Sequence, residues 1–194
     1  MPIDTARIEA AVADILSAIG EDVARPGLSS TPRRVAEAYA DFFSGLDVDP
    51  VEPLRDRVEL RPDERGELVL VRGLDFRSMC EHHLLPFLGT AHIAYVPRDG
   101  AVGLGAIARV LETLASRPQL QERLGEEVAQ ALETGLGAAG VLVVLEAVHG
   151  CVSARGVRQV RSSTVTVASR GTLADPAQRA CVLALVGSPA GAPA

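Results

Sequence analysis

The chain has 194 residues, of which 47% are hydrophobic, and a formal net charge of −6. This length suits one well-packed domain with a helical extension and excludes two large domains. The acidic balance argues against a nucleic-acid surface, which normally carries a basic patch. No apolar stretch approaches membrane-spanning length, and the first 20 residues lack a signal-peptide pattern. With an odd number of cysteines, three in all, these features predict a soluble cytoplasmic protein without disulfides.

Two amphipathic helices are predicted in the first part of the chain. Asp4 can cap the first helix, whose apolar residues recur at helical spacing and stop near Gly20. Thr31 and Pro32 indicate the start of the second helix, as a cap followed by proline at the first helical position. Residues 1–50 are therefore expected to form an N-terminal helical arm.

The rest of the chain mixes strand and helix patterns. Alternating or continuous apolar residues predict strands, and apolar residues three or four apart predict helices. Strands are expected at 58–60, 68–71, 85–96, 141–145 and 162–168, and helices at 104–115, 120–136 and 176–186. This order predicts an α+β domain over residues 51–186, with an antiparallel sheet and helices on one face. Residues 187–194, rich in Gly, Pro and Ala, are expected to be disordered.

Candidate metal ligands gather in two short stretches. Cys80 and His83 stand three residues apart, so one turn can present a thiolate and an imidazole to a common point. His149 and Cys151 are two residues apart at the expected end of a strand, where alternate side chains face the same side. Thiolate and imidazole donors suit a borderline-soft cation such as Zn²⁺. The two pairs together therefore predict a zinc site, although either pair alone could be structural.

Two kinds of zinc site remain open at this point. With His82 or His149 as a fourth ligand, the site would be closed and structural. With only Cys80, His83 and Cys151 as ligands, the site would keep a position for water and would be catalytic. Neutral imidazoles beside an activated water suit general acid–base chemistry near neutral pH, which favours the catalytic site.

The remaining cysteine and histidine are interpreted as structural. Cys181 stands among apolar residues on the last predicted helix, so core packing is the better interpretation of its role. His92 lies inside a predicted strand and has no second candidate ligand near it in the sequence. Neither residue is expected to take part in the chemistry.

Five short segments of the chain carry a resemblance to a known family and stand in that family's order. They are residues 31–36 (TPRRVA), 79–83 (MCEHH), 89–95 (GTAHIAY), 117–124 (RPQLQERL) and 149–156 (HGCVSARG). Together they resemble the GTP cyclohydrolase I family. The resemblance implies a tunnelling fold, in which the sheets of several subunits join into a barrel, a toroidal homodecamer and active sites between subunits. It also implies a zinc-dependent hydrolase that converts GTP and water to 7,8-dihydroneopterin triphosphate and formate, for folate or pterin biosynthesis.

The resemblance assigns roles to individual residues. The zinc ligands of the family fall on Cys80, His83 and Cys151, and its catalytic histidines fall on His82 and His149. Its guanine-anchoring carboxylate falls on Glu122, with Gln121 beside it, and its phosphate-binding arginines fall on Arg109, Arg155 and Arg34. Arg34 is expected to reach the site of a neighbouring subunit. A carboxylate suits the guanine because it can accept paired hydrogen bonds from the edge of the base.

The chain departs from the family pattern at Gly105 and Ala106. The family has a serine and a lysine here, and the lysine helps to hold the triphosphate. Loss of one close cationic partner and one hydroxyl would weaken binding by roughly 2 to 5 kcal/mol. Guanidinium groups bind phosphate in a bidentate way, so the three arginines can compensate. Two alternatives follow: a paralogue that opens another purine, with or without phosphates, and a non-catalytic scaffold or regulatory protein with structural zinc.

Overall fold

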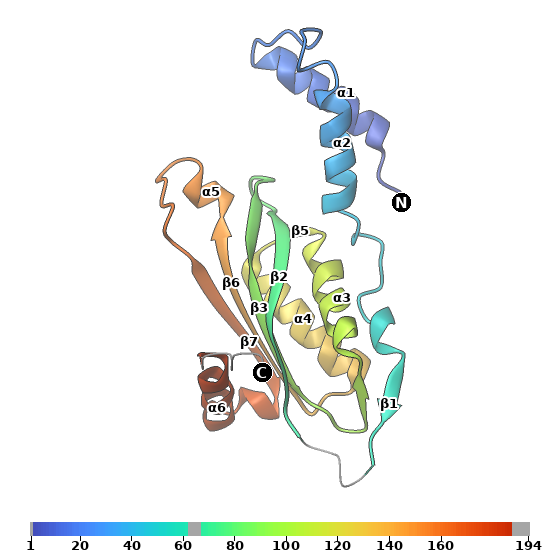
Figure 1. Ribbon diagram of the computed structural model, residues 1–194, viewed down its shortest axis with the longest axis vertical. Helices are drawn as coiled ribbons and strands as arrows, with labels where there is room; N and C mark the ends of the chain where they lie inside the picture. The colour runs from blue at the N-terminus through green and yellow to red at the C-terminus, as the bar shows by residue number, and fades with distance from the viewer. Residues whose placement is uncertain (1, 62–66, 188–194) are drawn as a thin grey trace, which may run out of the picture.

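The computed structural model describes residues 2–61 and 67–187 of the chain (Figure 1). The predicted tail lies outside the described residues except for Gly187, the last residue of the last helix. The helices are α1 (Thr5–Ala18), α2 (Thr31–Phe42), η1 (Glu52–Leu54), α3 (Leu104–Ala115), α4 (Gln121–Leu136), α5 (Gly150–Ser153), η3 (Thr172–Ala174) and α6 (Pro176–Gly187). The strands are β1 (Arg57–Glu59), β2 (Val69–Cys80), β3 (Pro86–Val96), β4 (Gly100–Val102), β5 (Pro118–Gln119), β6 (Gly140–His149) and β7 (Thr164–Gly171).

The central sheet has five strands in the order β5-β2-β3-β6-β7. Strands β2, β3, β6 and β7 pair in antiparallel fashion, and the two residues of β5 run parallel to the end of β2 at Met79 and Cys80. The short strands β1 and β4 form a separate antiparallel pair. The α+β class with an antiparallel sheet is confirmed.

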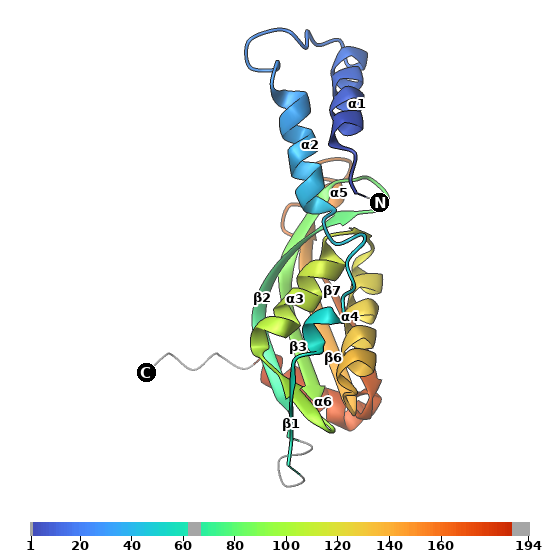
Figure 2. The same ribbon diagram turned by 90° about the vertical axis from the view of Figure 1, so that its right-hand side faces the viewer.

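Helices α3 and α4 cover one face of the sheet (Figure 2). Ile93, Val143 and Leu145 are buried in one cluster with the apolar side chains of these two helices, including Leu111 and Leu132. Burial of such side chains is the main source of stability in a domain of this size. Two helices on one face of an antiparallel sheet is the arrangement expected for one subunit of the tunnelling fold.

Helix α6 lies on the other face of the sheet. There Val182 of α6 and Leu173 of η3 pack on Ala94, Leu142 and Val144, whose side chains point away from α3 and α4. The prediction that Cys181 is buried in the core is wrong, because Cys181 lies on the exposed side of this helix. Only one face of α6 meets the sheet, so an apolar sequence does not make all of its residues core residues.

Strand β2 is much longer than the four residues predicted for it. A register shift between Val71 and Leu74 interrupts the alternation of inward and outward side chains. Gly73 sits at this bulge with φ of 72°, a left-handed conformation that glycine adopts without steric cost. The broken alternation explains why the sequence pattern ends early.

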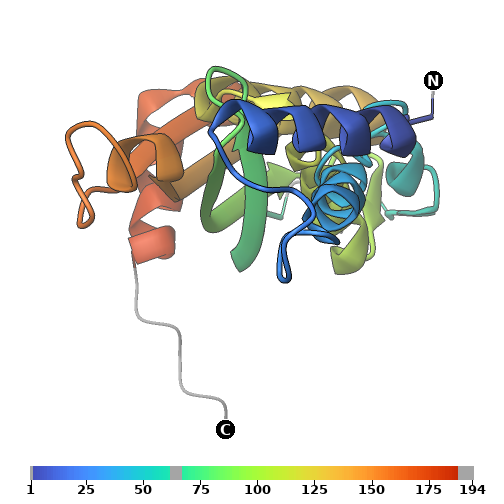
Figure 3. The same cartoon turned by 90° about the horizontal axis from the view of Figure 1, so that it is seen from above.

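Helices α1 and α2 pack against each other and extend beyond the end of the sheet (Figures 1 and 2). In Figure 3, which looks from that end, α2 is seen nearly end-on and α1 lies across the view. The Asp4 side chain caps α1 as predicted, because it accepts a hydrogen bond from the Arg7 N–H at 2.9 Å. Helix α2 instead has Ser30 as its cap residue, so Thr31 already lies inside the helix.

Arg77 connects this helical pair to the sheet. Its guanidinium group donates to Asp41 of α2 at 2.6 Å and lies 4.8 Å from the centre of the Phe42 ring. Arg117 donates to the carbonyls of Gly45 and Val48, both at 2.8 Å. These contacts fix the end of α2 close to the edge strand β2.

Candidate active site

The turn between β2 and β3 presents the first group of candidate ligands. The Cys80 N–H donates to the Leu85 carbonyl at 2.9 Å, and the Cys80 carbonyl accepts from the Leu84 N–H at 2.8 Å. Leu84 has φ of 49°, a conformation that is uncommon for a residue with a β-carbon. The surrounding hydrogen bonds hold this strained residue in place. The chain therefore reverses sharply just after Cys80 and brings His83 back toward it.

Cys80 and His83 have the spacing of two ligands on one metal ion. Their Sγ and Nδ1 atoms are 3.7 Å apart. Tetrahedral zinc, with bonds of about 2.3 Å to sulfur and about 2.0 Å to nitrogen, would separate such a pair by roughly 3.6 Å. The possible ligand atoms of Cys80, His82 and His83 all lie within 4.8 Å of one another. The donor types and their separation therefore fit zinc.

Cys151 reaches the same place from a different element. The prediction that Cys151 follows His149 on a strand is wrong, because β6 ends at His149 and Cys151 lies in the short helix α5. Burial raises the pKa of the Cys151 thiol, and the neighbouring Cys80 thiol raises it further, while Arg155 opposes the change. The effect of the Cys80 thiol on Cys151 shows that the two side chains are neighbours, and two neighbouring cysteines are typical of a site that a cation would complete.

His149 is the last residue of β6, directly before the helix α5 that carries Cys151. Its ring stacks on Phe87 with centroids 4.7 Å apart and planes 7° from parallel, and its Nε2 atom lies 2.7 Å from Oε1 of Gln121. Burial lowers the pKa of His149, and the charge on Glu122 partly opposes this. The ring is therefore biased toward the neutral form near neutral pH, which suits a group that exchanges protons.

Glu122 and Gln121 begin helix α4 but differ in environment. Glu122 is exposed in the first turn, whereas Gln121 is only 1% exposed. The next residue, Arg123, forms an ion pair with Glu81, which lowers the pKa of the Glu81 carboxyl. This ion pair ties the start of α4 to the turn that carries Cys80, so the two parts of the site are held together.

The three candidate phosphate-binding arginines are exposed and come from separate elements. Arg34 lies on α2, Arg109 on α3 and Arg155 just after α5. Helix α3 begins near β4 and ends near β5, which pairs with β2 at Met79 and Cys80 (Figure 1). At about 1.5 Å per helical residue, the start of α3 lies roughly 16 Å from the end that adjoins the cysteine. One chain therefore does not gather Gly105, Ala106 and the metal group at one point.

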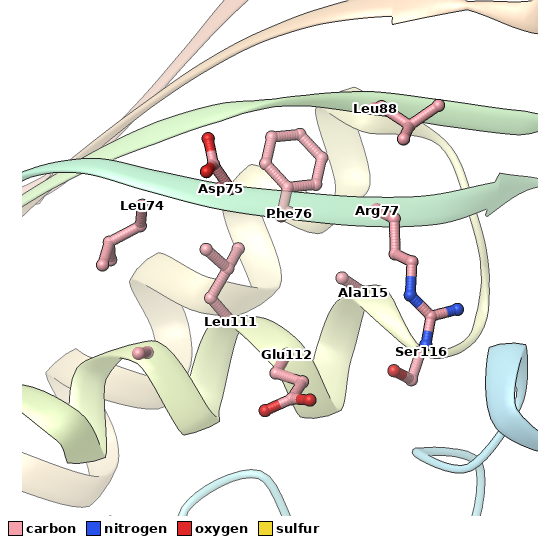
Figure 4. Close-up of a pocket in the computed structure, with 10 residues that line it drawn as sticks. Leu74, Asp75, Phe76, Arg77, Leu88, Leu111, Glu112, Ala115 and Ser116 are labelled. Atoms are coloured by element: carbon pink, nitrogen blue, oxygen red, sulfur yellow. The ribbon is translucent and has the colours of Figure 1, made fainter.

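A pocket of about 480 Å³ lies between β2 and α3 (Figure 4). Apolar side chains such as Phe76 and Leu111 and charged side chains such as Arg77 and Glu112 line it. None of the predicted site residues belongs to its lining. The pocket follows the outer edge of the sheet rather than the turn that carries Cys80 and His83.

Two contacts of the site could not be expected from sequence motifs. Phe87 stacks on His149 because residues 87 and 149 are direct partners in the register of β3 and β6. The contact of Gln121 with His149 joins residues 28 positions apart. Sequence spacing indicates neither contact, because both depend on how the strands and α4 are aligned.

Comparison with known proteins relates these residues to one family. The family model described as GTP cyclohydrolase I matches residues 8–187. A protein of Leifsonia xyli named GTP cyclohydrolase 1 is 59% identical over 184 residues, which cover 95% of this chain and 96% of that protein. Proteins of the same name from Rhodopirellula baltica and Bacillus subtilis are 51% and 49% identical, covering 95% and 90% of this chain and 80% and 91% of theirs. Among the described helices, none has the length and apolar composition needed to cross a membrane.

Proposed function

Because the chain belongs to the GTP cyclohydrolase I family, we propose that it converts GTP and water to 7,8-dihydroneopterin triphosphate and formate. The observation that supports this proposal is the approach of His83 and Cys151 to Cys80, within the part of the chain that matches the family. The enzyme is then a hydrolase of folate or pterin biosynthesis.

Zinc is the cofactor that the donor set favours. In the proposed site Cys80, His83 and Cys151 hold the ion, and His82 and His149 remain outside its ligand sphere. Two thiolates and one imidazole leave a fourth position open, as in catalytic zinc sites. Bound there, zinc would supply a Lewis acid for the activation of water.

The two histidines carry the proton transfers in this proposal. His149 is biased toward the neutral form by burial, so it can accept or return a proton near neutral pH. His82 is exposed beside His83, with ring centroids 6.0 Å apart, where an incoming base can contact it. One of the two rings protonates a nitrogen of the purine as water adds to C8. The imidazole ring of the purine opens, formate leaves, and the ribose carbons rearrange and close onto the exposed amine.

Substrate recognition is divided between the base and the phosphates. Glu122 is exposed at the start of α4 and can accept paired hydrogen bonds from the guanine edge. Gln121 lies beside it, with its amide oxygen directed toward His149. The triphosphate is assigned to Arg109, Arg155 and Arg34, whose guanidinium forks match phosphate geometry.

The location of these residues supports a homo-oligomer as part of the proposal. The start of α3 is far from the metal group of its own chain, so a second copy would supply α3 and its Arg109 to each site. Strand β2 is an outer strand whose residues 69–78 have no further partner strand among the described residues, and β7 is the outer strand at the opposite edge. Long free edges are normally covered in native proteins. Pairing of β2 with β7 of another copy would cover both edges and build the barrel of the proposed decamer.

The proposed site also needs a reducing compartment. Cys80 and Cys151 must remain thiols to bind a metal, and both are free in the structure. Oxidising surroundings would favour a disulfide between thiols this close. A cytoplasmic location is therefore part of the proposal.

A substrate panel tests the proposed function against its nearest alternative. Gly105 and Ala106 favour a relaxed phosphate site, so the alternative is a purine with fewer phosphates. Zinc-loaded protein is incubated with GTP, GMP, guanosine and guanine, and formate and pterin fluorescence are measured. Turnover of GTP supports the proposal. Turnover of guanosine or GMP with none of GTP would replace it with the alternative, and no turnover of any compound would favour a non-catalytic protein.

A further inference from the structure

The amide of Gln121 has only one orientation that its surroundings allow. Its Nε2 atom lies 3.0 Å from the Leu145 carbonyl, 2.9 Å from the Thr164 carbonyl and 3.2 Å from Oγ1 of Thr166. A backbone carbonyl accepts hydrogen bonds and never donates them. A reversed amide would place its oxygen against two carbonyl oxygens, in a region where Gln121 is 1% exposed and water cannot intervene. The NH₂ group must therefore face β6 and β7, and the oxygen must face His149.

This orientation determines which nitrogen of His149 carries a proton. Oε1 of Gln121 can only accept, and it lies 2.7 Å from Nε2 of His149. A hydrogen bond of that length requires a proton on Nε2. We infer that Gln121 is a positioning residue that holds neutral His149 as the Nε2–H tautomer and leaves Nδ1 as its only basic nitrogen.

Phe87 fixes the remaining freedom of the ring. Its ring is stacked face to face on the His149 ring, so it restricts tilting, while the bond to Gln121 restricts rotation about the side chain. The His149 ring then has one protonated nitrogen directed into the protein and one unprotonated nitrogen. Any proton that His149 takes up during the reaction goes to Nδ1.

This inference deepens the proposed function. Its catalytic part rests on that proposed function, and it changes the expected role of Gln121. The polar atoms of the Gln121 amide are all engaged within the chain, so the residue serves His149 instead of the guanine. Glu122, which is exposed, keeps the base-binding role. Loss of such a positioning residue should change kcat and leave KM nearly unchanged, because His149 acts in the reaction rather than in substrate binding.

Gln119 provides a matched control. It is also a buried glutamine, 2% exposed, and it lies two residues before Gln121. Its Nε2 group bonds to the Leu114 carbonyl and to Glu127, and no bond joins it to His149. Gln119→Leu therefore reproduces the loss of a buried amide without touching the histidine.

The tautomer can be read without any assay of activity. Zinc-loaded protein labelled with ¹⁵N-histidine is examined by solid-state NMR above the ordinary histidine pKa, and His149 is assigned by the signal missing from His149→Gln. The expected result is a proton on Nε2, shifted downfield by its hydrogen bond, and an unprotonated Nδ1. Gln121→Leu should lose the downfield shift, and Gln119→Leu should keep it. A wild-type His149 with its proton on Nδ1 overturns the inference even if no variant folds, as does an unchanged proton signal in Gln121→Leu.

Kinetics then connects the tautomer to turnover. Gln121→Leu is expected to lower kcat for GTP about 10- to 100-fold, as is usual when the partner that orients a site histidine is removed, with KM nearly unchanged. A rise in KM at constant kcat would instead assign Gln121 to the base and overturn the positioning role. If the NMR result holds but GTP is not turned over at all by the wild type, the proposed function fails and the tautomer assignment stands.

Discussion

The Nδ1 atom of His83 lies 3.7 Å from the Sγ atom of Cys80, across a turn of three residues. Backbone hydrogen bonds between Cys80 and residues 83–85 shape the turn that holds the two side chains at this distance. The turn therefore fixes the separation of the two proposed ligands, which would reduce the ordering that binding of an ion requires. Cys151 approaches Cys80 from a different element, the short helix α5.

Removal of one proposed ligand should abolish zinc retention. Cys151→Ala leaves only Cys80 and His83 as ligands, so purified protein should hold little zinc after gel filtration and should show almost no turnover of GTP. Elemental analysis of zinc per chain is the measurement. Cys181→Ala is the matched control, because Cys181 is also a free cysteine but lies exposed on α6. Zinc at the wild-type level in Cys151→Ala would remove Cys151 from the ligand set.

A change at His82 separates the catalytic zinc site from the closed structural one. If His82 acts on the substrate, His82→Asn should keep its zinc and its melting temperature while kcat falls about 10²- to 10⁴-fold, the usual contribution of a general acid or base. Zinc content, thermal unfolding and kcat are measured on the same preparation. Loss of zinc together with stability would identify His82 as a fourth ligand.

The phosphate end of the site can be tested at Gly105. A β-carbon added there meets no atom within 4 Å, so Gly105→Ser fits into the chain without rearrangement. The new hydroxyl should bond to a charged phosphate and lower KM for GTP about 10-fold, with little effect on guanosine. Gly105→Ala is the control that adds the β-carbon without the hydroxyl. Equal KM values for the two variants would exclude phosphate contact at this position.

Acid sensitivity of the fold should depend in part on His92. Burial lowers the pKa of His92 below its ordinary value of 6.5, Arg72 lowers it further, and Glu146 opposes them. The neutral ring accepts a hydrogen bond from the Gly73 N–H at 3.4 Å, which protonation of Nδ1 would remove. Because the unfolded chain then binds more protons than the native state, stability is complete above pH 6.5 and falls as the pH drops through the folded pKa.

The His92→Gln variant should therefore lose less stability than the wild type when the pH is lowered. The urea midpoints of both proteins are compared at about pH 7.5 and about pH 5.5, on either side of the ordinary histidine pKa. Burial also lowers the pKa of His149, so some acid sensitivity should remain in the variant. An identical fall in the midpoint for both proteins would contradict a role for His92.

The sequence predicted the features that depend on local spacing. The bounds of α3 were correct at both ends, because its apolar residues repeat every three or four positions. The proximity of Cys80 and His83 could also be predicted from the sequence, since one turn contains both residues. The prediction that Cys151 lies on a strand was wrong, because Gly150 starts a helix and the alternation of side chains along a strand ends at His149.

Contacts between distant segments could not be derived from such patterns. Phe87 faces His149 only because β3 and β6 pair in one particular register. Gln121 reaches His149 only because α4 begins beside β6 and β7. A single sequence does not specify strand register or helix placement, so the position of His149 was predictable and its environment was not.

The most direct test of the whole account follows one carbon atom of GTP. GTP carrying ¹³C at C8 is incubated with the zinc-loaded protein, and the products are examined by ¹³C NMR. If the protein carries out the proposed reaction, the label should appear in formate and be absent from a pterin triphosphate formed in equal amount. Label that remains attached to the purine after prolonged incubation with folded, zinc-containing protein would contradict the proposed reaction.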